Sequence, residues 1–368
     1  MFTFARSIDQ SVLGLTSLLV ALSMMFQGET LERSSSPHRA LSWFGDSDGT
    51  DTSSTDTADS DEATTMLLGI FSHDSTADAA ERRSLIRKTY LANTDTRICS
   101  LNVFLSGENA DCRVAYTFVL GGWNKEQFPD APTDHVNDDE PLVVLDKKVS
   151  DDEDDVTYLN IKENMNDGKS YTWFKYAAYL EGAKDDGTPR IGATNRRAIH
   201  YVAKADADTL ISMNALLDYM NQDLPPSPYN NNFFGGIPTA NVAKNHMYMQ
   251  GQLYFISLNL AKYIGYELTG EERQTITRGY WEEKHAKLFV HEDVSVGTLV
   301  YSHPRPIKLV SVAKGARFWR HPVKGTDEWM NYWDDGNFNP DTTVSKHHDW
   351  IQLPYNSACR VYGVYKGS

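Results

Sequence analysis

The ten residues from 199 to 208, Ile-His-Tyr-Val-Ala-Lys-Ala-Asp-Ala-Asp, carry the strongest signal for the fold. The apolar run Ile199–Ala203 predicts a buried strand, and the segment then becomes acidic at Asp206 and Asp208. In sheets of parallel strands the chemistry gathers at the carboxyl ends of the strands. The segment therefore predicts a strand that delivers two carboxylates to a binding site.

The rest of the chain favours an α/β fold. Short apolar runs predict further strands, and longer amphipathic or aromatic-rich stretches predict helices. The predicted strands are 66–71, 98–105, 114–120 and 141–146, and the predicted helices are 79–90, 164–183, 213–220 and 253–264. Strands that alternate with helices indicate a mostly parallel sheet covered by helices on both faces. The segment 286–290 leads into a second acidic signature.

The net charge of −15 is concentrated in a few places. Three runs, 46–62, 138–140 and 151–155, contain as many acids as that net charge and no bases. The remainder is close to neutral, and no concentrated basic surface is visible. Nucleic acid is therefore not expected as a partner, because binding its phosphates requires such a surface.

The amino-terminal segment predicts a membrane attachment. Gln10–Gly28 contains no charged residue and has about the length that crosses a bilayer, roughly 20 residues. We expect residues 1–28 to be a cytoplasmic tail and signal-anchor helix, with a cleaved signal peptide or a buried helix as alternatives. Residues 29–65 are rich in Ser, Thr, Asp and Gly, which predicts a flexible acidic stem. Residues 66–368 then form one globular domain.

Three cysteines, Cys99, Cys112 and Cys359, cannot all pair with one another. No Cys-x-x-Cys spacing occurs, so a structural zinc site is not expected. In an oxidising compartment one disulfide could form. The sequence leaves open whether that disulfide is the local pair Cys99–Cys112 or a long-range pair with Cys359.

Asp206 and Asp208 form the first candidate site. Residues two apart in an extended segment point the same way, and paired carboxylates without a thiolate suit Mn²⁺ or Mg²⁺. Such an ion would neutralise a departing diphosphate. The alternative is a solvated acidic turn at the end of a strand.

The second signature is His291-Glu-Asp-Val-Ser-Val-Gly297. Asp293 follows an apolar segment, and a half-buried carboxylate at a strand–helix junction can act as general base toward a sugar hydroxyl. Its alternative role is to cap the helix that begins there. Glu292 is the less favoured candidate for the base.

Five short motifs then resemble one family in the same order along the chain. Lys204–Asp208 is similar to the Lys-x-Asp-Asp-Asp motif of β-1,3-galactosyltransferases and β-1,3-N-acetylglucosaminyltransferases, and Glu292–Gly297 to their Glu-Asp-Val-x-x-Gly. Glu81–Tyr90, Phe118–Gly121 and Tyr158–Asn160 resemble their Glu-Arg-Arg-x-x-Ile-Arg-x-Thr-Trp, Phe-Leu-Leu-Gly and Tyr-x-Asn-Leu-Thr. The resemblance covers about Leu67 to His321. Two departures are Ala207, in place of the middle Asp, and Gly251-Gln-Leu-Tyr254, in place of the family's Gly-Gly-Gly-Tyr acceptor loop.

The resemblance implies a GT-A fold, a UDP-sugar donor, Mn²⁺ and an inverting transfer. Asp206 and Asp208 would hold the metal, and Asp293 would deprotonate the acceptor. Members of the family and its relatives often supply a downstream histidine to the metal, for which we choose His321, with His303 and His347–His348 as alternatives.

The donor would have further contacts. Arg83 and Arg87 share one face of a helix, and the resemblance places that helix near the nucleotide, where guanidinium groups could meet phosphate or uracil oxygens. Lys204 and Asp206 are the other expected donor-binding residues. Trp329, Tyr332 and Trp333 lie in a loop-like stretch among acids and are candidates to stack on an acceptor sugar, with ordinary packing as the alternative.

We therefore expect a Golgi-type, single-pass type II glycosyltransferase whose lumenal domain acts on a glycan, glycoprotein or glycolipid. A catalytically impaired UDP-sugar- or glycan-binding protein on the same fold is the first alternative, and a metal-dependent phosphohydrolase is the second. The residues do not distinguish galactose from N-acetylglucosamine in the donor, and they do not identify the acceptor or the linkage.

Overall fold

The computed structural model describes residues 63–92, 95–122, 154–163, 168–182, 191–241, 246–278, 291–312, 318–321, 323, 325–334 and 363–365. These residues belong to one compact unit, Ala58–Ser368. Several predictions fall outside the described residues: the tail and anchor, residues 29–62 of the stem, the strand 141–146, the segment 286–290, Cys359 and the pair His347–His348. The last residues of the predicted stem, Thr64 and Thr65, are buried and lead into β1. Within the described part of the chain, no helix combines the length and the apolar character that crossing a membrane requires.

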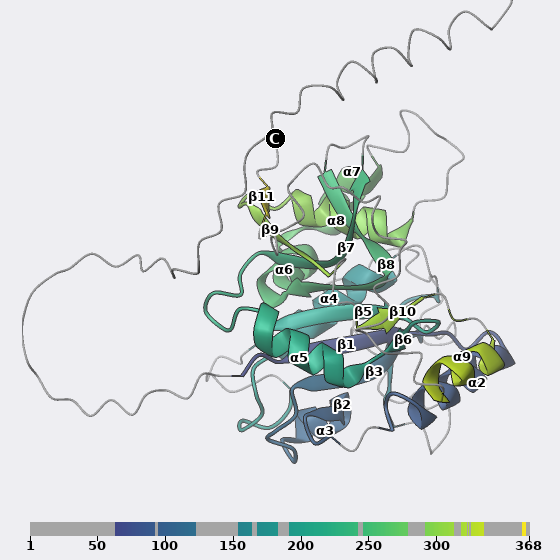
Figure 1. Ribbon diagram of the computed structural model, residues 1–368. Coiled ribbons are helices and arrows are strands. Elements are labelled where there is room, and N and C mark those ends of the chain that lie inside the picture. The colour runs from purple at the N-terminus through teal and green to yellow at the C-terminus, as the bar shows by residue number, and fades with distance from the viewer. Residues whose placement is uncertain are drawn as a thin grey trace, which may run out of the picture. The chain divides into compact units, whose positions relative to one another are not determined.

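A nine-stranded mixed sheet forms the centre of the described part of the molecule (Figure 1). Its strand order is β11-β9-β7-β8-β5-β1-β3-β2, and β4 also pairs with β3. The strands are β1 (Met66–Phe71), β2 (Ile98–Ser100), β3 (Val114–Gly121), β4 (Val156–Leu159), β5 (Tyr201–Asp206), β7 (Phe233–Asn241), β8 (His246–Ser257), β9 (Ile307–Ser311) and β11 (Gly363–Tyr365). A separate two-stranded ribbon pairs β6 (Leu210–Ile211) with β10 (Trp319–Arg320).

Parallel pairing dominates the half of the sheet that β5 borders. β5, β1 and β3 run parallel to one another, and both β2 and β4 run parallel to β3. On the other side, β8 is antiparallel to β5 and to β7, β9 is parallel to β7, and β11 is antiparallel to β9. The predicted mostly parallel α/β sheet is therefore confirmed, with an antiparallel insertion around β8 that the sequence did not indicate.

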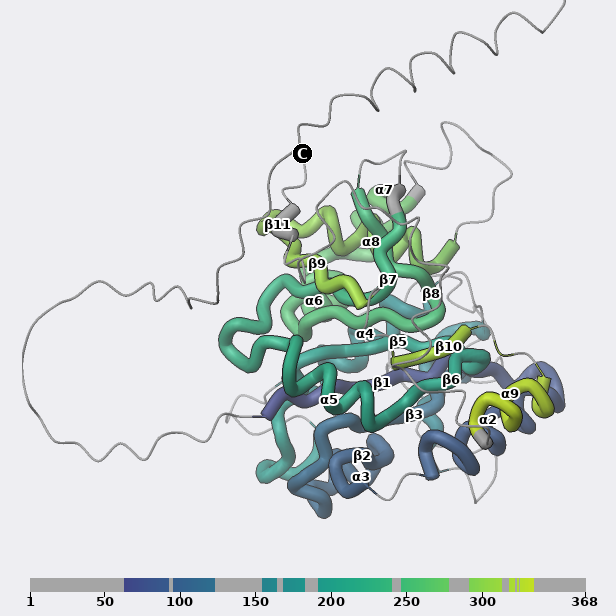
Figure 2. The backbone as a smooth tube through the Cα atoms, in the orientation of Figure 1, coloured from purple at the N-terminus to yellow at the C-terminus, as the bar shows by residue number. Residues whose placement is uncertain are grey.

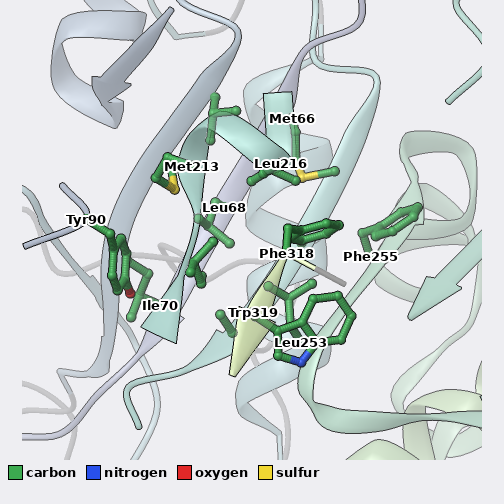
Figure 3. Close-up of a cluster of buried hydrophobic side chains, with 14 of the residues drawn as sticks. Met66, Leu68, Ile70, Tyr90, Met213, Leu216, Leu253, Phe255, Phe318 and Trp319 are labelled. Carbon is green, nitrogen blue, oxygen red and sulfur yellow. The ribbon is translucent and has the colours of Figure 1, made fainter. Parts of the chain in front are cut away.

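Helices cover both faces of this sheet (Figures 1 and 2). They are α2 (Ala77–Lys88), α3 (Leu101–Ser106), α4 (Lys169–Leu180), α5 (Met213–Asp223), α6 (Leu258–Lys262) with the π-helical turn η1 (Tyr263–Glu267), α7 (Gly270–Arg278), α8 (Glu292–Tyr301) and α9 (Thr326–Asp334). The alternation of side chains along β1 divides the core in two. Leu68 packs with α5 and Trp319 on one face (Figure 3), and Leu67 packs with α4 on the other.

Helix α4 approaches the sheet closely because β1 carries a glycine at the point of contact. A Cβ atom on Gly69 would lie 2.6 Å from the Trp173 ring, which leaves no room for any side chain there. The Trp173 indole donates a hydrogen bond to the carbonyl of Ala203 at 3.1 Å. The aromatic side chains Trp173, Phe174 and Tyr176 are all buried, and α4 is thus fixed against β1 and β5.

The predicted strand 98–105 is wrong after its first three residues. β2 ends at Ser100, whose side chain accepts a hydrogen bond from the Val103 N–H and so caps helix α3. Gly107, with a φ of 71°, ends that helix in a left-handed conformation. The apolar run satisfied the pattern of a strand, but its serine and glycine are the start and stop signals of a short helix. Cys99 on β2 forms the disulfide with Cys112, the local one of the two pairings considered.

The predicted helix 253–264 is also wrong in its first half. Leu253–Ser257 is the end of β8 and lies between β5 and β7. Because both faces of this central strand are covered, its four apolar residues are all buried and show no alternation. A short continuous apolar run does not distinguish such a strand from a buried helix. The chain becomes helical only at Leu258.

Candidate active site

The central strand β5 places the first acidic signature at the carboxyl edge of the sheet, where the parallel strands end. Asp206 is the last residue of β5, at the carboxyl end of three neighbouring parallel strands. The chain then turns sharply, because the Thr209 N–H donates to the Asp206 carbonyl at 3.0 Å. The Thr209 hydroxyl donates to the carbonyl of Gln252 on β8 at 3.0 Å and anchors this turn. The predicted location of Asp206 and Asp208 at the carboxyl edge is confirmed.

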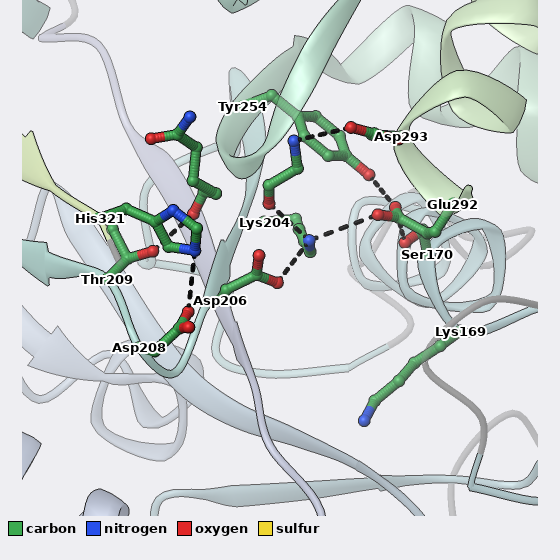
Figure 4. Close-up of polar contacts among 12 residues, drawn as sticks. Lys169, Ser170, Lys204, Asp206, Asp208, Thr209, Tyr254, Glu292, Asp293 and His321 are labelled. Carbon is green, nitrogen blue, oxygen red and sulfur yellow. Dashed lines mark hydrogen bonds and ion pairs between the residues drawn. The ribbon is translucent and has the colours of Figure 1, made fainter. Parts of the chain in front are cut away.

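A distant segment brings His321 to the same turn. In the β6–β10 ribbon, Arg320 lies opposite Leu210, so His321, the residue after β10, continues toward the Asp208 turn. The Val323 N–H donates to the Asp208 carbonyl at 3.0 Å, which fixes the segment on the other side of His321. The His321 Nε2 lies 3.1 Å from Asp208 Oδ1 (Figure 4).

Asp206, Asp208 and His321 together form a group with the composition of a metal site. One ligand atom from each can be chosen so that all three lie within 4.8 Å of one another. Two ligands on opposite sides of a Mg²⁺ ion lie about 4.2 Å apart. The three ligand atoms would therefore have to move only slightly closer together to bind an ion. Two carboxylates and an imidazole suit Mn²⁺ or Mg²⁺ and leave further positions for water or phosphate oxygens.

The surroundings act differently on the two carboxylates of this group. Burial raises the pKa of Asp206, and the adjacent Lys204 ammonium opposes that rise without cancelling it. Burial acts in the same direction on Asp208, but the hydrogen bond and charge of His321 outweigh it, so the pKa of Asp208 is lowered. The described neighbours of both carboxylates include a cationic or hydrogen-bond-donating side chain that favours the ionised form.

Lys204 is an internal cation that joins three elements. Its side chain is only 4% exposed, and its Nζ lies 2.6 Å from Asp206 Oδ1 and 3.3 Å from Glu292 Oε2. The same Nζ donates to the Gly251 carbonyl at 2.5 Å. Burial alone would lower the pKa of Lys204, but the two carboxylates raise it, so the ammonium stays charged. In this arrangement Lys204 connects β5, β8 and α8.

Glu292 is held on all sides by protein groups. Its Oε1 accepts hydrogen bonds from the hydroxyls of Ser170 and Tyr254, and its Oε2 pairs with Lys204 (Figure 4). Its side chain is 11% exposed. A carboxylate with this many partners is poorly placed to accept a proton from a substrate. The sequence did not indicate these contacts.

Asp293 lies in the first turn of α8, and its carboxylate faces β8. The helix is capped at His291 without a side-chain hydrogen bond, so the capping role considered for Asp293 is not the one it plays. Its Oδ1 accepts from the Val294 N–H at 2.8 Å, and its Oδ2 accepts from the Gly251 N–H at 3.0 Å. A Cβ atom on Gly251 would lie 3.5 Å from both Asp293 Oδ2 and Lys204 Nζ. Asp293 and the Asp206–Lys204 pair are therefore neighbours across Gly251.

The surroundings of Asp293 increase its affinity for a proton. Burial raises its pKa, and the negative charge of Glu292 adds to the rise. The N–H group of Val294, the Lys204 ammonium and the Gly251 N–H act in the opposite direction without cancelling it. A half-buried carboxylate with a raised pKa is a suitable general base, because proton transfer is favoured when donor and acceptor are better matched.

The two arginines predicted to contact the donor have partners in the protein. Arg83 is 1% exposed and donates to the Ser72 hydroxyl at 3.2 Å and to the His73 carbonyl at 2.9 Å, just beyond β1. Arg87 makes two hydrogen bonds, of 2.9 and 2.6 Å, to the Asp155 carboxylate. Arg83 thus lies beside the carboxyl end of β1, whereas Arg87 fastens α2 to the segment before β4.

The aromatic residues proposed for stacking do not form a common surface. Trp329 is in helix α9 rather than in a loop, is fully buried, and donates to the Thr89 hydroxyl at 3.1 Å. An acceptor contact by Trp329 is therefore wrong. The hydroxyl of Tyr332 accepts from Arg320 at 2.5 Å, and Trp333 is 37% exposed. His303 contacts Tyr263 instead of the acidic group.

Comparisons with known proteins return little. No family model matches this sequence, and no curated protein matches it. Among solved structures, two crystal structures of the glycosyltransferase GlyE from Streptococcus pneumoniae TIGR4, one of them the apo form, are similar to it at 10% sequence identity and TM-scores of 0.30 and 0.31. The matches cover 65% and 79% of this chain but only 43% and 57% of those chains. Values this low do not establish a shared fold, so the function must be argued from the residues of the site.

Proposed function

We propose that this protein is a metal-dependent glycosyltransferase that moves a sugar from a nucleotide diphosphate donor to an acceptor hydroxyl with inversion. The observation that supports it most is the arrangement across Gly251. A possible metal group, Asp206, Asp208 and His321, lies on one side, and a single raised-pKa carboxylate, Asp293, lies on the other. A reaction that releases a diphosphate while it deprotonates a hydroxyl needs these two parts together.

Asp206, Asp208 and His321 would hold Mn²⁺ or Mg²⁺ through three ligand atoms. The ion would supply Lewis-acid stabilisation of the leaving diphosphate. Lys204 holds Asp206 in place and is itself held by Glu292, because its ammonium group contacts both carboxylates. Lys204 and Arg83, which lies beside the carboxyl end of β1, would contact the donor. Arg87 would act there indirectly, through its pair with Asp155.

Asp293 would accept the proton of the acceptor hydroxyl. The oxygen then forms a bond to the anomeric carbon while the bond from that carbon to the diphosphate oxygen breaks. The electron pair of the broken bond leaves with the nucleotide diphosphate, and the proton remains on Asp293. A single displacement from the face opposite the leaving group inverts the anomeric centre. The Gly251 N–H, at 3.0 Å from Oδ2, orients the carboxylate for this step.

The finer identity of the reaction belongs to the proposal as well. The five motifs resemble those of β-1,3-galactosyltransferases and β-1,3-N-acetylglucosaminyltransferases, which favours UDP-galactose or UDP-N-acetylglucosamine as donor, a β-1,3 linkage and a GT-A fold. The uncharged segment 10–28 and the acidic stretch after it favour a type II protein of the Golgi membrane. The Cys99–Cys112 disulfide supports a lumenal domain, because disulfides persist in oxidising compartments.

The test is a panel of UDP-sugars supplied to the purified protein with and without MnCl₂, scored for transfer to sugar acceptors and for hydrolysis. We expect one UDP-hexose to be used, and only with the metal. Asp293→Asn should lower transfer by about 10²-fold or more while UDP binding is retained. Asp218→Asn, an exposed aspartate on α5, is the matched control and should behave as the wild type.

Two results would reject this function. UDP binding without turnover of any donor by the wild type would favour the non-catalytic binding protein. Release of phosphate from simple phosphate esters, without any need for a sugar acceptor, would favour the phosphohydrolase.

A further inference from the structure

A chain of polar side chains crosses the β7–β8 hairpin beside the candidate active site. The Trp319 indole donates to Gln252 Oε1 at 3.1 Å, and Gln252 Nε2 donates to Gln250 Oε1. Gln250 Nε2 then donates to the Thr239 hydroxyl at 3.1 Å. The Thr239 hydroxyl in turn interacts with the phenol of Tyr248. We call these five residues the amide chain.

The direction of the hydrogen bonds in the amide chain is fixed at one end. The indole N–H of Trp319 can only donate, so the oxygen of Gln252 must face it. The amide nitrogen of Gln252 then points to Gln250, and the same reasoning orients the second amide. Both amides therefore present their donors and acceptors in one defined arrangement. This favours ligand binding, because the two side chains lose little conformational freedom when a ligand binds.

The amide chain runs between the two catalytic parts of the site. At one end, Trp319 is two residues before His321, and the carbonyl of Gln252 accepts from Thr209 in the Asp206–Asp208 turn. At the other end, burial raises the pKa of Tyr248, and the charge of the nearby Asp293 adds to the rise. Gly251, which holds Asp293, lies between the two glutamines in the sequence.

The two amides have capacity that the amide chain does not use. Gln250 and Gln252 are both partly exposed, unlike the buried Trp319. An amide offers two N–H groups and two lone pairs, and among the described contacts each glutamine uses one of each within the chain. One donor and one acceptor remain on each amide, a combination that matches a hydroxyl group, which both donates and accepts. The amide chain contains no ionised side chain, so it suits an uncharged ligand.

We propose that Gln250 and Gln252 bind hydroxyl groups of a neutral acceptor sugar and so determine which acceptor is used. This inference rests on the proposed function, because it assigns the acceptor side of the same site. The resemblance implies an acceptor loop at Gly251–Tyr254 but has glycine at position 252, so a role for the two glutamine side chains goes beyond it. Recognition would depend on hydrogen bonds, because Trp319 is buried by its contacts with the core and offers no face to a sugar ring.

The experiment compares Gln252→Leu and Gln250→Leu with the wild-type full chain. Gln222→Leu is the matched control, because Gln222 is an exposed glutamine near the end of α5. The neighbouring Asn221 accepts a hydrogen bond from Arg113, which also donates to the Thr64 carbonyl just before β1. The control residue therefore lies at the edge of the sheet opposite to the candidate site. Three measurements are made: hydrolysis of UDP-galactose and UDP-N-acetylglucosamine without acceptor, transfer to methyl β-galactoside, methyl β-N-acetylglucosaminide and their monodeoxy analogues, and binding of the same glycosides by saturation-transfer NMR.

Each glutamine variant should lower kcat/KM for the acceptor by about tenfold per lost hydrogen bond, mainly through KM, and should lower metal-dependent donor hydrolysis by much less. With the monodeoxy acceptor that lacks the bound hydroxyl, the wild type and the variant should become equal. A purely structural role would instead lower donor hydrolysis as much as transfer and affect all acceptors alike.

The outcomes separate this inference from the proposed function. If the wild type hydrolyses the donor and both glutamine variants transfer to every acceptor as well as Gln222→Leu does, the acceptor assignment is overturned and the proposed glycosyl transfer remains. Glycoside binding that disappears in Gln252→Leu, in a protein that turns over no donor, supports the assignment and rejects the transferase. A wild type that binds none of the glycosides and transfers to none overturns the assignment.

Discussion

Replacement of Lys204 by methionine tests the internal cation on which the site is built. Methionine keeps the length of the apolar stem and removes the ammonium. The change leaves Asp206 and Glu292, whose side chains are 23% and 11% exposed, without the cation that lies 2.6 and 3.3 Å from them. It also removes the donor that the Gly251 carbonyl uses.

The expected loss of stability is large. Breaking a buried ion pair by removal of one partner costs about 3–5 kcal/mol, because an uncompensated buried charge remains. The contact with the Gly251 carbonyl belongs to the same network, so its loss is included in this range instead of being added to it. Set against a typical domain stability of about 5–15 kcal/mol, the variant should still fold but unfold at markedly lower denaturant concentration.

A divalent metal should restore part of this loss. An ion held by Asp206 and Asp208 supplies positive charge to the carboxylate that Lys204 compensated, and removal of the ammonium removes a repulsion on that ion. Each tenfold gain in metal affinity adds about 1.4 kcal/mol of stabilisation at saturation. MnCl₂ should therefore raise the unfolding free energy of Lys204→Met by more than it raises that of the wild type.

The assay is urea unfolding followed by fluorescence, with and without MnCl₂. Lys169→Met is the control, because Lys169 is another buried lysine and is paired with Glu163 at 2.7 Å instead of with a proposed metal ligand. It should lose stability without a larger response to metal. A Lys204→Met protein as stable as the wild type, or one with the same metal increment as Lys169→Met, would refute the reasoning.

Three further outcomes follow from the same structure. Burial raises the pKa of Asp293, so the acid limb of kcat/KM against pH should rise through a pKa above the ordinary aspartate value of about 3.9, and a limb at or below that value would count against Asp293 as base. His321→Ala should weaken Mn²⁺ binding, measured by calorimetry, by at least about tenfold, since even residues that only orient a ligand contribute that much; an unchanged affinity would remove His321 from the site. Reduction of Cys99–Cys112, which are 13 residues apart, should lower the unfolding free energy by about 3 kcal/mol in the wild type and equally in Cys359→Ser, and a reductant effect confined to the wild type would implicate Cys359 instead.

The parts of the site that the sequence predicted are those in which neighbouring residues act together. Asp206 ends β5 and Asp208 lies in the turn that follows, so their common edge follows from their closeness in the sequence and not from the period of an extended chain, which was the reason the sequence suggested. His321 depended on the family resemblance and not on any local pattern, and its contact with Asp208 exists only because β10 pairs with β6. The register of a two-residue ribbon leaves no periodic signal in a sequence.

The contacts that the sequence missed connect distant segments through single side chains. Ser170, Lys204, Tyr254 and Glu292 come from four elements, and none has a pattern that points to the others. Buried polar residues of this kind are read as exposed or as core until their partners are known. The misassigned start of β8 has a related cause, because burial on both faces of the sheet removes the alternation that identifies a strand.

The alanine at position 207 is explained by the direction in which it points. The residue is partly buried and packs against the apolar cluster between the sheet and α5, whereas the carboxylates before and after it converge with His321. An aspartate at 207 would thus direct a third carboxylate at apolar side chains, where an unpaired charge is costly. In the proposed function, the metal group would obtain its third ligand from His321 and not from the middle of the acidic motif. On this geometry the departure at Ala207 removes charge from the turn without removing a ligand, and it does not argue against catalysis.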